Sequence, residues 1–263
     1  MRKINLIWGF KLIKSKNLKK IKNLKHGFFN SEGGKSKDIY RSLNCGPGSK
    51  DSSSNIKRNL EIVKKKISYS AKDIFLLNQI HSNKFIFIDK NFKLKKKPKA
   101  DAIITDLKKF PIAVLTADCA PILLYENQKK IIAAIHAGWK GAYKGIIGKV
   151  INFMINKGCK PENIIASIGP SISGDSYEVQ QEFKRKFIKK NLKNSKFFKK
   201  KNNKLYFDLS RYVYSLLLKD KIKKIETIKI DTFNIKNKFF SARRALNLKH
   251  NDYGRNISVI MLN

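Results

Sequence analysis

The chain contains little cysteine, proline or acidic charge: three cysteines, six prolines and 19 Asp and Glu residues among 263. Three widely spaced cysteines do not form a disulfide framework, so a reducing compartment, the cytoplasm, is expected. No apolar run approaches the roughly 18 residues needed to cross a bilayer. The apolar start, Met1–Phe10, is followed by lysines rather than by a small-residue cleavage site, which argues against a signal peptide. The composition therefore favours neither a disulfide-rich secreted domain nor a membrane protein.

Positive charge is abundant instead, because 58 Lys and Arg residues give a net charge of +39. The excess is spread along the whole chain and is carried mainly by lysine, as a nucleotide-composition bias would produce. The densest run, Lys184–Lys204, contains interleaved phenylalanines that suit either base stacking or a solvated helix with one apolar face. We favour the solvated face and expect only weak, salt-sensitive binding to polyanions, with no specific nucleic-acid partner and no membrane partner.

The length and the apolar fraction of 42% predict a single mixed α/β domain over residues 1–263. Apolar spacing predicts helices over 55–67, 143–157, 178–187 and from 209 to about 218. Short apolar runs predict one or two strands within 1–29 and further strands at 85–88, 100–105, 112–116, 131–135, 161–168, 206–208, 225–230 and 257–261. An extended apolar segment is expected at 73–80. Residues 30–54 form a long loop, and loops of that length in compact domains tend to be functional.

The rest of the chain is organised around residues 112–141. Two apolar runs in this stretch end at potential metal ligands, the first at Asp118-Cys119 and the second at His136. The turn-like residues 126–129 between the runs predict that the two strands pair, and Pro121 predicts an interruption of the ladder just beyond Cys119. A thiol and an imidazole at the ends of neighbouring buried strands are then expected to converge.

His81 follows another apolar segment and completes a possible set with Cys119 and His136. Two imidazoles and one thiolate suit zinc, with a fourth position left for water or substrate. The spacing matches no zinc knuckle, and the zinc-deaminase and P-loop motifs are absent. A buried cysteine with two hydrogen-bonded histidines, a cysteine nucleophile with a base and a blue-copper trio therefore stay open alternatives.

Other polar residues near these ligands suggest supporting roles. Asp118 suits proton transfer or orientation of a ligand, or else it is a turn carboxylate paired with a lysine. Gln79 lies on the same expected strand face as His81 and suits hydrogen bonding to a substrate, or is an ordinary strand-end residue. The glycines between 138 and 148 suit an anion at a helix start or close packing. His26 and His250 are expected at the surface.

An ordered set of motifs resembles the laccase-domain purine nucleoside phosphorylases, also called YfiH-like proteins and long labelled multicopper polyphenol oxidases. The similar segments span residues 26–260 and are His26–Phe29 with Gly33-Gly34, Ser42–Asn44, Gln79–Ser82, Ala100–Ala102, Thr116–Pro121, His136–Gly141, Ile168–Ile172, Tyr177–Val179, Phe239–Ser241 with Arg243-Arg244, and Tyr253–Arg255.

This resemblance implies an α-β-β-α sandwich that holds zinc through His81, Cys119 and His136, with copper as the alternative. The implied activities are phosphorolysis of adenosine, inosine and S-methyl-5′-thioadenosine and deamination of adenosine, with purine nucleosides and phosphate as the partners. Asp118 is then the catalytic residue. The expected substrate-binding residues are Asn44, Gln79, Lys140 and Arg58. A monomer or weak homodimer is expected.

Three departures from the family pattern accompany this resemblance. Asn30-Ser31 precedes the Gly-Gly pair where Thr-Arg is common, and Leu60 follows Asn59 where Arg is common. If the missing arginines hold phosphate, Arg58, Lys35 or Lys140 must substitute for them. Asp231-Thr232 replaces a common Cys-Thr, which is expected to leave the three-ligand site intact.

Overall fold

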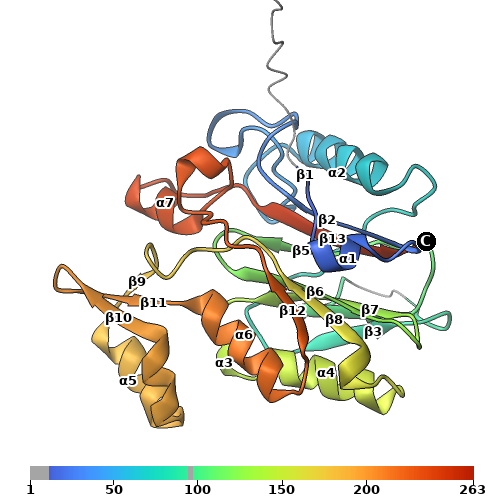
Figure 1. Cartoon of the computed structure of the whole chain (residues 1–263). Coiled ribbons are helices and arrows are strands. Elements are labelled where there is room, and N and C mark those ends of the chain that lie inside the picture. Colours follow the sequence, from blue (N-terminus) through green and yellow to red (C-terminus); the bar gives the residue numbers. More distant parts are fainter. Residues whose placement is uncertain (1–11, 94–96) are drawn as a thin grey trace, which may run out of the picture.

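Two β-sheets lie face to face in the computed structural model, which describes residues 12–93 and 97–263 (Figure 1). The four-stranded sheet has the order β1 (Leu12–Ile13), β2 (Leu24–Phe29), β13 (Asn256–Leu262) and β5 (Ile112–Thr116). The six-stranded sheet has the order β12 (Lys224–Thr227), β8 (Ile164–Ile168), β6 (Ala120–Glu126), β7 (Ile131–Ala137), β4 (Ala102–Thr105) and β3 (Phe85–Ile88). A small third sheet contains β10 (Phe198–Lys201), β11 (Lys204–Phe207) and β9 (Glu178–Val179).

Helices cover the outer face of each large sheet (Figure 1). The helices of the described residues are α1 (Lys16–Lys19), α2 (Ser53–Ile67), α3 (Trp139–Tyr143), α4 (Ile146–Asn156), α5 (Gln181–Lys190), α6 (Leu209–Lys219) and α7 (Ala242–Asn247). Short 3₁₀ turns occur at Asp38–Tyr40, Pro161–Asn163, Leu192–Phe197 and Ile235–Asn237. Among the described residues, none of these helices combines the length and the apolarity that a membrane crossing requires.

Successive side chains along a strand alternate between the space between the two sheets and the outer face of the sheet, and this alternation produces the layers. In β5, Val114 points between the sheets, whereas Ala113 points outward to the cluster that contains Val63 of α2. In β7, Ala134 points between the sheets and Ile135 points outward to the cluster that contains α4 and α6. Each strand therefore contributes to two apolar interfaces. The predicted mixed α/β class and the α-β-β-α sandwich are confirmed; the assignment of residues 1–263 to one domain stays a prediction.

The pairing expected between the runs at 112–116 and 131–135 is wrong. β5 pairs with β13 in one sheet, and β7 pairs with β6 in the other, so the turn at 126–129 joins β6 to β7. The interruption expected at Pro121 does not occur, because this residue stands opposite His136 within the ladder. β8 ends at Ile168, opposite Ile122, so the proline nitrogen, which lacks an N–H, faces no residue of that strand, and the Pro121 carbonyl accepts the Gly169 N–H.

Two other elements differ from expectation. The helix predicted over 143–157 is observed as α4, which begins three residues later because Gly145, whose φ of 85° is left-handed, separates it from the short helix α3. Residues 73–80 form no regular strand and make only the isolated bridges Phe75–Ile112 and Asn78–Lys99. The expected apolar start at Met1–Phe10 lies outside the described residues, as does part of the charged link at 93–99.

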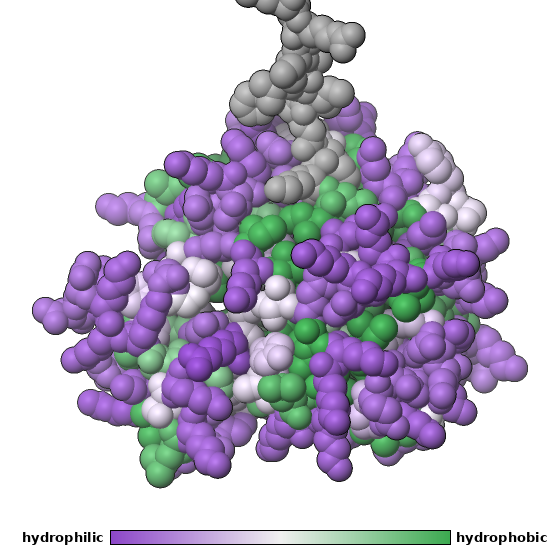
Figure 2. Space-filling view, viewed as in Figure 1, coloured by the Kyte–Doolittle hydropathy of each residue, from purple (hydrophilic) through white to green (hydrophobic). Residues whose placement is uncertain are grey.

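The lysine-rich run Lys184–Lys204 passes through α5, a 3₁₀ turn and β10. Its phenylalanines point inward: Phe187 and Phe197 are buried and belong to an aromatic cluster with Phe207 and Tyr212. These rings are therefore core residues, as the solvated-face interpretation requires. Hydrophilic side chains cover most of the face seen in Figure 2.

His26 is buried, with an exposed fraction of 3%, so the expectation that it lies at the surface is wrong; His250 is exposed as expected. The Nε2 atom of His26 accepts the Ser15 N–H at 2.9 Å. Burial, aided by the charge of Lys14, lowers the pKa of His26 to about 4 from 6.5. The folded protein therefore holds this imidazole neutral at a pH where the unfolded chain would protonate it.

We predict that this imidazole makes the protein less stable in mild acid. As pH falls from 6.5 to 4, the unfolded state binds a proton that the folded state excludes, so the free energy of unfolding falls by about 3 kcal/mol. Urea unfolding at several pH values measures this slope. His26→Gln, which does not titrate, should have a shallower slope across the same window. Equal slopes in the two proteins would refute the assignment.

Candidate metal centre

The chain crosses from one large sheet to the other between β5 and β6, and Cys119 lies in this crossing. β5 ends at Thr116 in the four-stranded sheet, and β6 begins at Ala120 in the six-stranded sheet. Ala120 pairs with Ala137 of β7, which places Cys119 beyond the end of the strand that carries His136. Long-range pairing of β6 with β7 thus brings the thiol and the imidazole together.

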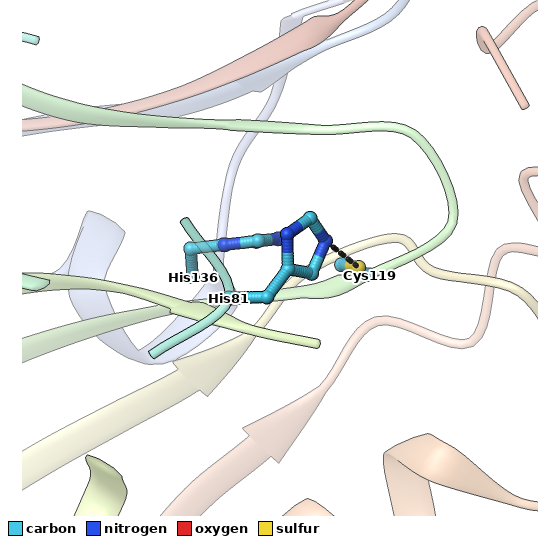
Figure 3. A group of neighbouring side chains, drawn as sticks. All are labelled: His81, Cys119 and His136. Carbon is cyan, nitrogen blue, oxygen red and sulfur yellow. Dashed lines mark hydrogen bonds between the residues drawn. The ribbon is translucent and has the colours of Figure 1, made fainter. Parts of the chain in front are cut away.

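His81 is positioned by a buried carboxylate rather than by a strand. Asp101, fully buried at the start of β4, accepts backbone N–H groups from Ile80, His81 and Ser82 and the Ser82 hydroxyl. These bonds hold the turn that places His81 at a φ of 56°, a left-handed conformation that a non-glycine residue adopts only when its surroundings enforce it. The turn directs the imidazole toward Cys119 (Figure 3).

The same carboxylate orients His136. The Nδ1 atom of His136 lies 2.9 Å from an Asp101 oxygen, and the imidazole is 3% exposed. A carboxylate partner at Nδ1 requires this nitrogen to carry a proton, so Nε2 is left as a ligand. Asp101 therefore fixes both histidines: one through the backbone and the other through the ring.

The three potential ligand atoms lie within 4.8 Å of one another. The sulfur of Cys119 is 3.9 Å from Nε2 of His81, and the two imidazole centroids are 4.7 Å apart at 77° (Figure 3). Tetrahedral zinc bonds of roughly 2.0–2.3 Å place neighbouring ligand atoms roughly 3.3–3.6 Å apart. Small side-chain movements would close the remaining gap, so the donor set fits one metal ion.

Gly138 leaves the space that such an ion needs. A Cβ atom added there would lie 2.9 Å from the Cys119 sulfur, 3.0 Å from Cδ2 of His81 and 3.7 Å from Nε2 of His136. The φ of −67° at Gly138 is open to any residue, so backbone freedom does not require glycine here. The feature that glycine provides is an empty volume between the three ligands.

The ligands influence one another's protonation. Burial opposes ionisation of Cys119, but the neighbouring imidazoles lower its pKa to about 6. Burial likewise opposes protonation of His136, yet the Cys119 sulfur and Asp101 raise its pKa to about 9. Without metal, a thiolate therefore lies beside an imidazolium at neutral pH, and a bound cation would take the place of the shared proton.

A cavity of about 550 Å³ opens beside these ligands, within the range of roughly 300–1,000 Å³ that small-molecule sites have. It is lined by residues of four segments: Gly46–Gly48, Leu77–Gln79 with His81, Leu115–Ala117 with Cys119, and Tyr253 with Arg255, together with Lys97, Lys99 and His136. A larger cavity of about 940 Å³ lies between β10, α6 and residues 227–231. No histidine or cysteine lines the larger cavity, so the chemistry favours the smaller one.

Asp118 occupies a different environment from the one expected for a catalytic residue. Its carboxylate is buried and accepts the hydroxyls of Thr232 and Ser241 and the N–H of Arg243. Burial raises the pKa of Asp118 above its usual range. In the described part of the chain, no hydrogen bond links it to the three ligands; it anchors the start of α7. A catalytic role for Asp118 stays a prediction.

The four predicted substrate-binding residues divide into two groups. Gln79 and Asn44 lie at or near the cavity, but their amides are engaged: Gln79 bonds both backbone groups of Leu115, and Asn44 bonds Gly46, Ser49, Asp51 and Arg255. Arg58 on α2 and Lys140 on α3 are exposed and line no part of this cavity. The structure therefore supplies no contact for their predicted roles, which stay predictions.

Asp101, Gly138 and Arg255 are the site residues that the sequence reasoning did not assign. Asp101 and Arg255 stand in segments that resemble the family, but adjacency in the sequence drew attention to Asp118 instead. The available signal for Asp101 was a single acidic residue between two alanines in an apolar run. Burying a carboxylate without partners costs free energy, so an acid at such a position implies hydrogen-bond partners.

Replacing Asp101 with asparagine is predicted to loosen the whole site. The amide offers one acceptor oxygen where two now serve Ile80, His81, Ser82 and His136, so buried donors lose their partners. We expect the free energy of unfolding to fall by about 2–4 kcal/mol and metal affinity to fall by about 10–100-fold. Urea unfolding and chelator competition measure these changes. Asp106→Asn, at an exposed position, is the matched control, and equal behaviour of both variants would contradict the role.

Comparisons with known proteins find similar chains over most of the sequence. Residues 25–263 match the family described as multi-copper polyphenol oxidoreductase laccase. A purine nucleoside phosphorylase of Rickettsia conorii is 39% identical over 203 residues, covering 75% of this chain and 82% of that protein. A purine nucleoside phosphorylase of Bacteroides thetaiotaomicron is 30% identical over 258 residues, 94% of each chain. The crystal structure of a Neisseria meningitidis protein has a TM-score of 0.82 at 29% identity, covering 97% and 99% of the two chains.

Proposed function

The chain belongs to the multi-copper polyphenol oxidoreductase laccase family, and from this premise we propose that it is a zinc-dependent purine nucleoside phosphorylase. The observation that carries the proposal is the set of His81, Cys119 and His136 at the wall of a cavity of about 550 Å³. Relatives named purine nucleoside phosphorylase support the reaction class. The proposed substrates are adenosine, inosine and S-methyl-5′-thioadenosine with phosphate, and adenosine deamination is proposed as a second activity in a cytoplasmic protein.

Each site residue has a distinct part in this proposal. His81, Cys119 and His136 would hold the ion, which when bound supplies a Lewis acid that polarises an oxygen in the site. Asp101 keeps His136 in the tautomer that presents Nε2 and keeps the His81 turn in place. Phosphorolysis also needs cationic groups around phosphate as the base leaves the ribose. The cavity wall offers Arg255, Lys97 and Lys99 for that purpose.

The family description raises copper-dependent polyphenol oxidation as the second candidate, and two histidines with one cysteine also suit a copper trio. Several copper ions need many imidazoles, however, and the chain has four histidines. His26 is a buried acceptor of the Ser15 N–H, and His250 is exposed. Within the described residues, one group of three or more possible ligands occurs. A single-metal enzyme agrees better with this inventory.

Metal content and substrate conversion test the proposal together. Protein purified without added metal should contain about one zinc per chain by mass spectrometry, as three protein ligands predict. It should convert inosine to hypoxanthine only when phosphate is present, and it should release ammonia from adenosine without phosphate. Several coppers per chain with oxygen-dependent phenol oxidation would favour the second candidate. Activity that survives moderate salt would argue against a protein that mainly binds nucleic acid.

A further inference from the structure

The guanidinium of Arg255 is fixed at the wall of the cavity that contains the three ligands. Its Nη1 donates to the Tyr253 carbonyl at 2.7 Å and to the Asp252 carboxylate at 3.2 Å, and the group lies over the Tyr253 ring at 4.7 Å. Asp252 is itself held by the Tyr40 hydroxyl and the Lys50 N–H. The position of the charge is thus set before any ligand arrives.

The backbone around this arginine is equally constrained. The side-chain oxygen of Asn44 accepts the N–H groups of both Arg255 and Gly46, so it links two of the segments that line the cavity. Gly46 makes room for the arginine stem, because a Cβ atom there would lie 2.3 Å from the Arg255 Cδ. Asn256 pairs with Thr116 at the end of β5, so Arg255 lies opposite the segment that leads to Cys119. The geometry places a rigid cation beside the metal ligands.

Apart from the three metal ligands, the charged side chains on this cavity wall are all cationic. Arg255, Lys97 and Lys99 line the cavity, and no aspartate or glutamate does. An arginine has five N–H donors, and within the described residues only Nη1 of Arg255 donates to the protein beyond its own backbone. Lys99 is held by the bridge that its backbone makes with Asn78. The arrangement suits an anion with several acceptor oxygens.

We propose that Arg255, with Lys99 on the wall of the same cavity, binds the inorganic phosphate that attacks the nucleoside. This inference rests on the proposed phosphorylase function and adds the residue that recognises the second substrate. A planar guanidinium presents paired donors that match two phosphate oxygens, which an ammonium group cannot do. This proposal differs from the expectation that Arg58, Lys35 or Lys140 holds phosphate, since none of the three lines this cavity.

Arg255→Gln in the zinc-loaded protein provides the test, at constant ionic strength. We expect the KM for phosphate to rise by at least about tenfold, as loss of a charge-assisted pair implies, while the KM for inosine stays within about twofold. Arg255→Lys should give an intermediate loss because it keeps the charge without the fork. Arg185→Gln on α5 removes the same charge from an exposed position and should change neither constant.

Direct binding of inorganic phosphate, followed by equilibrium dialysis, separates this inference from the proposed function. If the parent protein binds phosphate through Arg255 but cleaves no nucleoside, the subsite stands and the phosphorylase function fails. If the parent protein is a phosphorylase and both Arg255 variants keep its phosphate KM and Kd, the subsite is overturned. Thermal unfolding shows which variants are folded. If Arg255→Gln is not folded, Arg255→Lys is compared with the parent protein instead.

Discussion

Cys119→Ala is expected to lose its metal and to slow turnover by at least about a thousandfold, because a bound Lewis acid contributes several kcal/mol to the barrier. The thiolate is the one anionic ligand in the set of His81, Cys119 and His136. Two imidazoles without it would neither neutralise the ion nor complete a three-ligand site. Metal analysis after dialysis and phosphate-dependent hypoxanthine release are the two measurements.

The fold should tolerate this change. Cys119 lies in the crossing between β5 and β6, and its side chain is only partly buried. Unfolding measured on metal-free protein is therefore expected to change by less than about 1 kcal/mol. Cys159→Ala is the matched control, since this buried cysteine packs in the core cluster around α4 and should cost stability without affecting metal. Stoichiometric zinc and normal turnover in Cys119→Ala would contradict the proposed site.

The sequence predicts the local features of this molecule well. Short continuous apolar runs and helical apolar spacing place β5, β7 and α2 within two residues of their observed bounds. The two strands are recognisable as apolar runs because each of them buries both faces within the sandwich. The pattern also identifies His81, Cys119 and His136 as possible ligands, since each follows an apolar run that ends at a polar side chain.

Pairing between distant segments is not encoded locally, and the incorrect predictions follow from that. No local pattern in residues 112–137 indicates that β5 belongs to a different sheet from β7, because both runs are equally apolar. Pro121 looked like a break, yet it is accommodated because β8 ends beside it. Register and strand order are set by the complete core, so a window of a few residues cannot supply them.

The same limit explains why Asp118 was chosen over Asp101. Asp118 adjoins Cys119 in sequence, but its φ of 84° turns the carboxylate toward α7. Asp101 reaches His136 only because β4 and β7 are neighbours in the six-stranded sheet. Likewise, β13 in the middle of the other sheet brings Arg255 to the cavity from the far end of the chain. Residues far apart in sequence complete the site that nearby residues begin.

Gly138→Ala is expected to exclude the metal while leaving the fold intact. The added Cβ would lie between the ligands, 2.9 Å from the Cys119 sulfur and 3.0 Å from Cδ2 of His81. The backbone at Gly138 already has a conformation that alanine adopts without strain, so the folding penalty is confined to the shifts that the Cys119 and His81 side chains must make. Metal affinity should fall by at least about a hundredfold, since one misplaced atom displaces several ligand bonds.

Gly48→Ala separates a lost metal from a general effect of adding a methyl group. Gly48 lines the same cavity, but a Cβ atom there would meet no atom within 4 Å. Chelator competition should therefore give the parent affinity for Gly48→Ala and a large loss for Gly138→Ala. Equal affinities for both variants would mean that the ion lies elsewhere, because an ion between these three side chains cannot share its position with a methyl group. A loss of metal affinity in Gly138→Ala alone would locate the ion at the point where the thiolate and the two imidazoles converge.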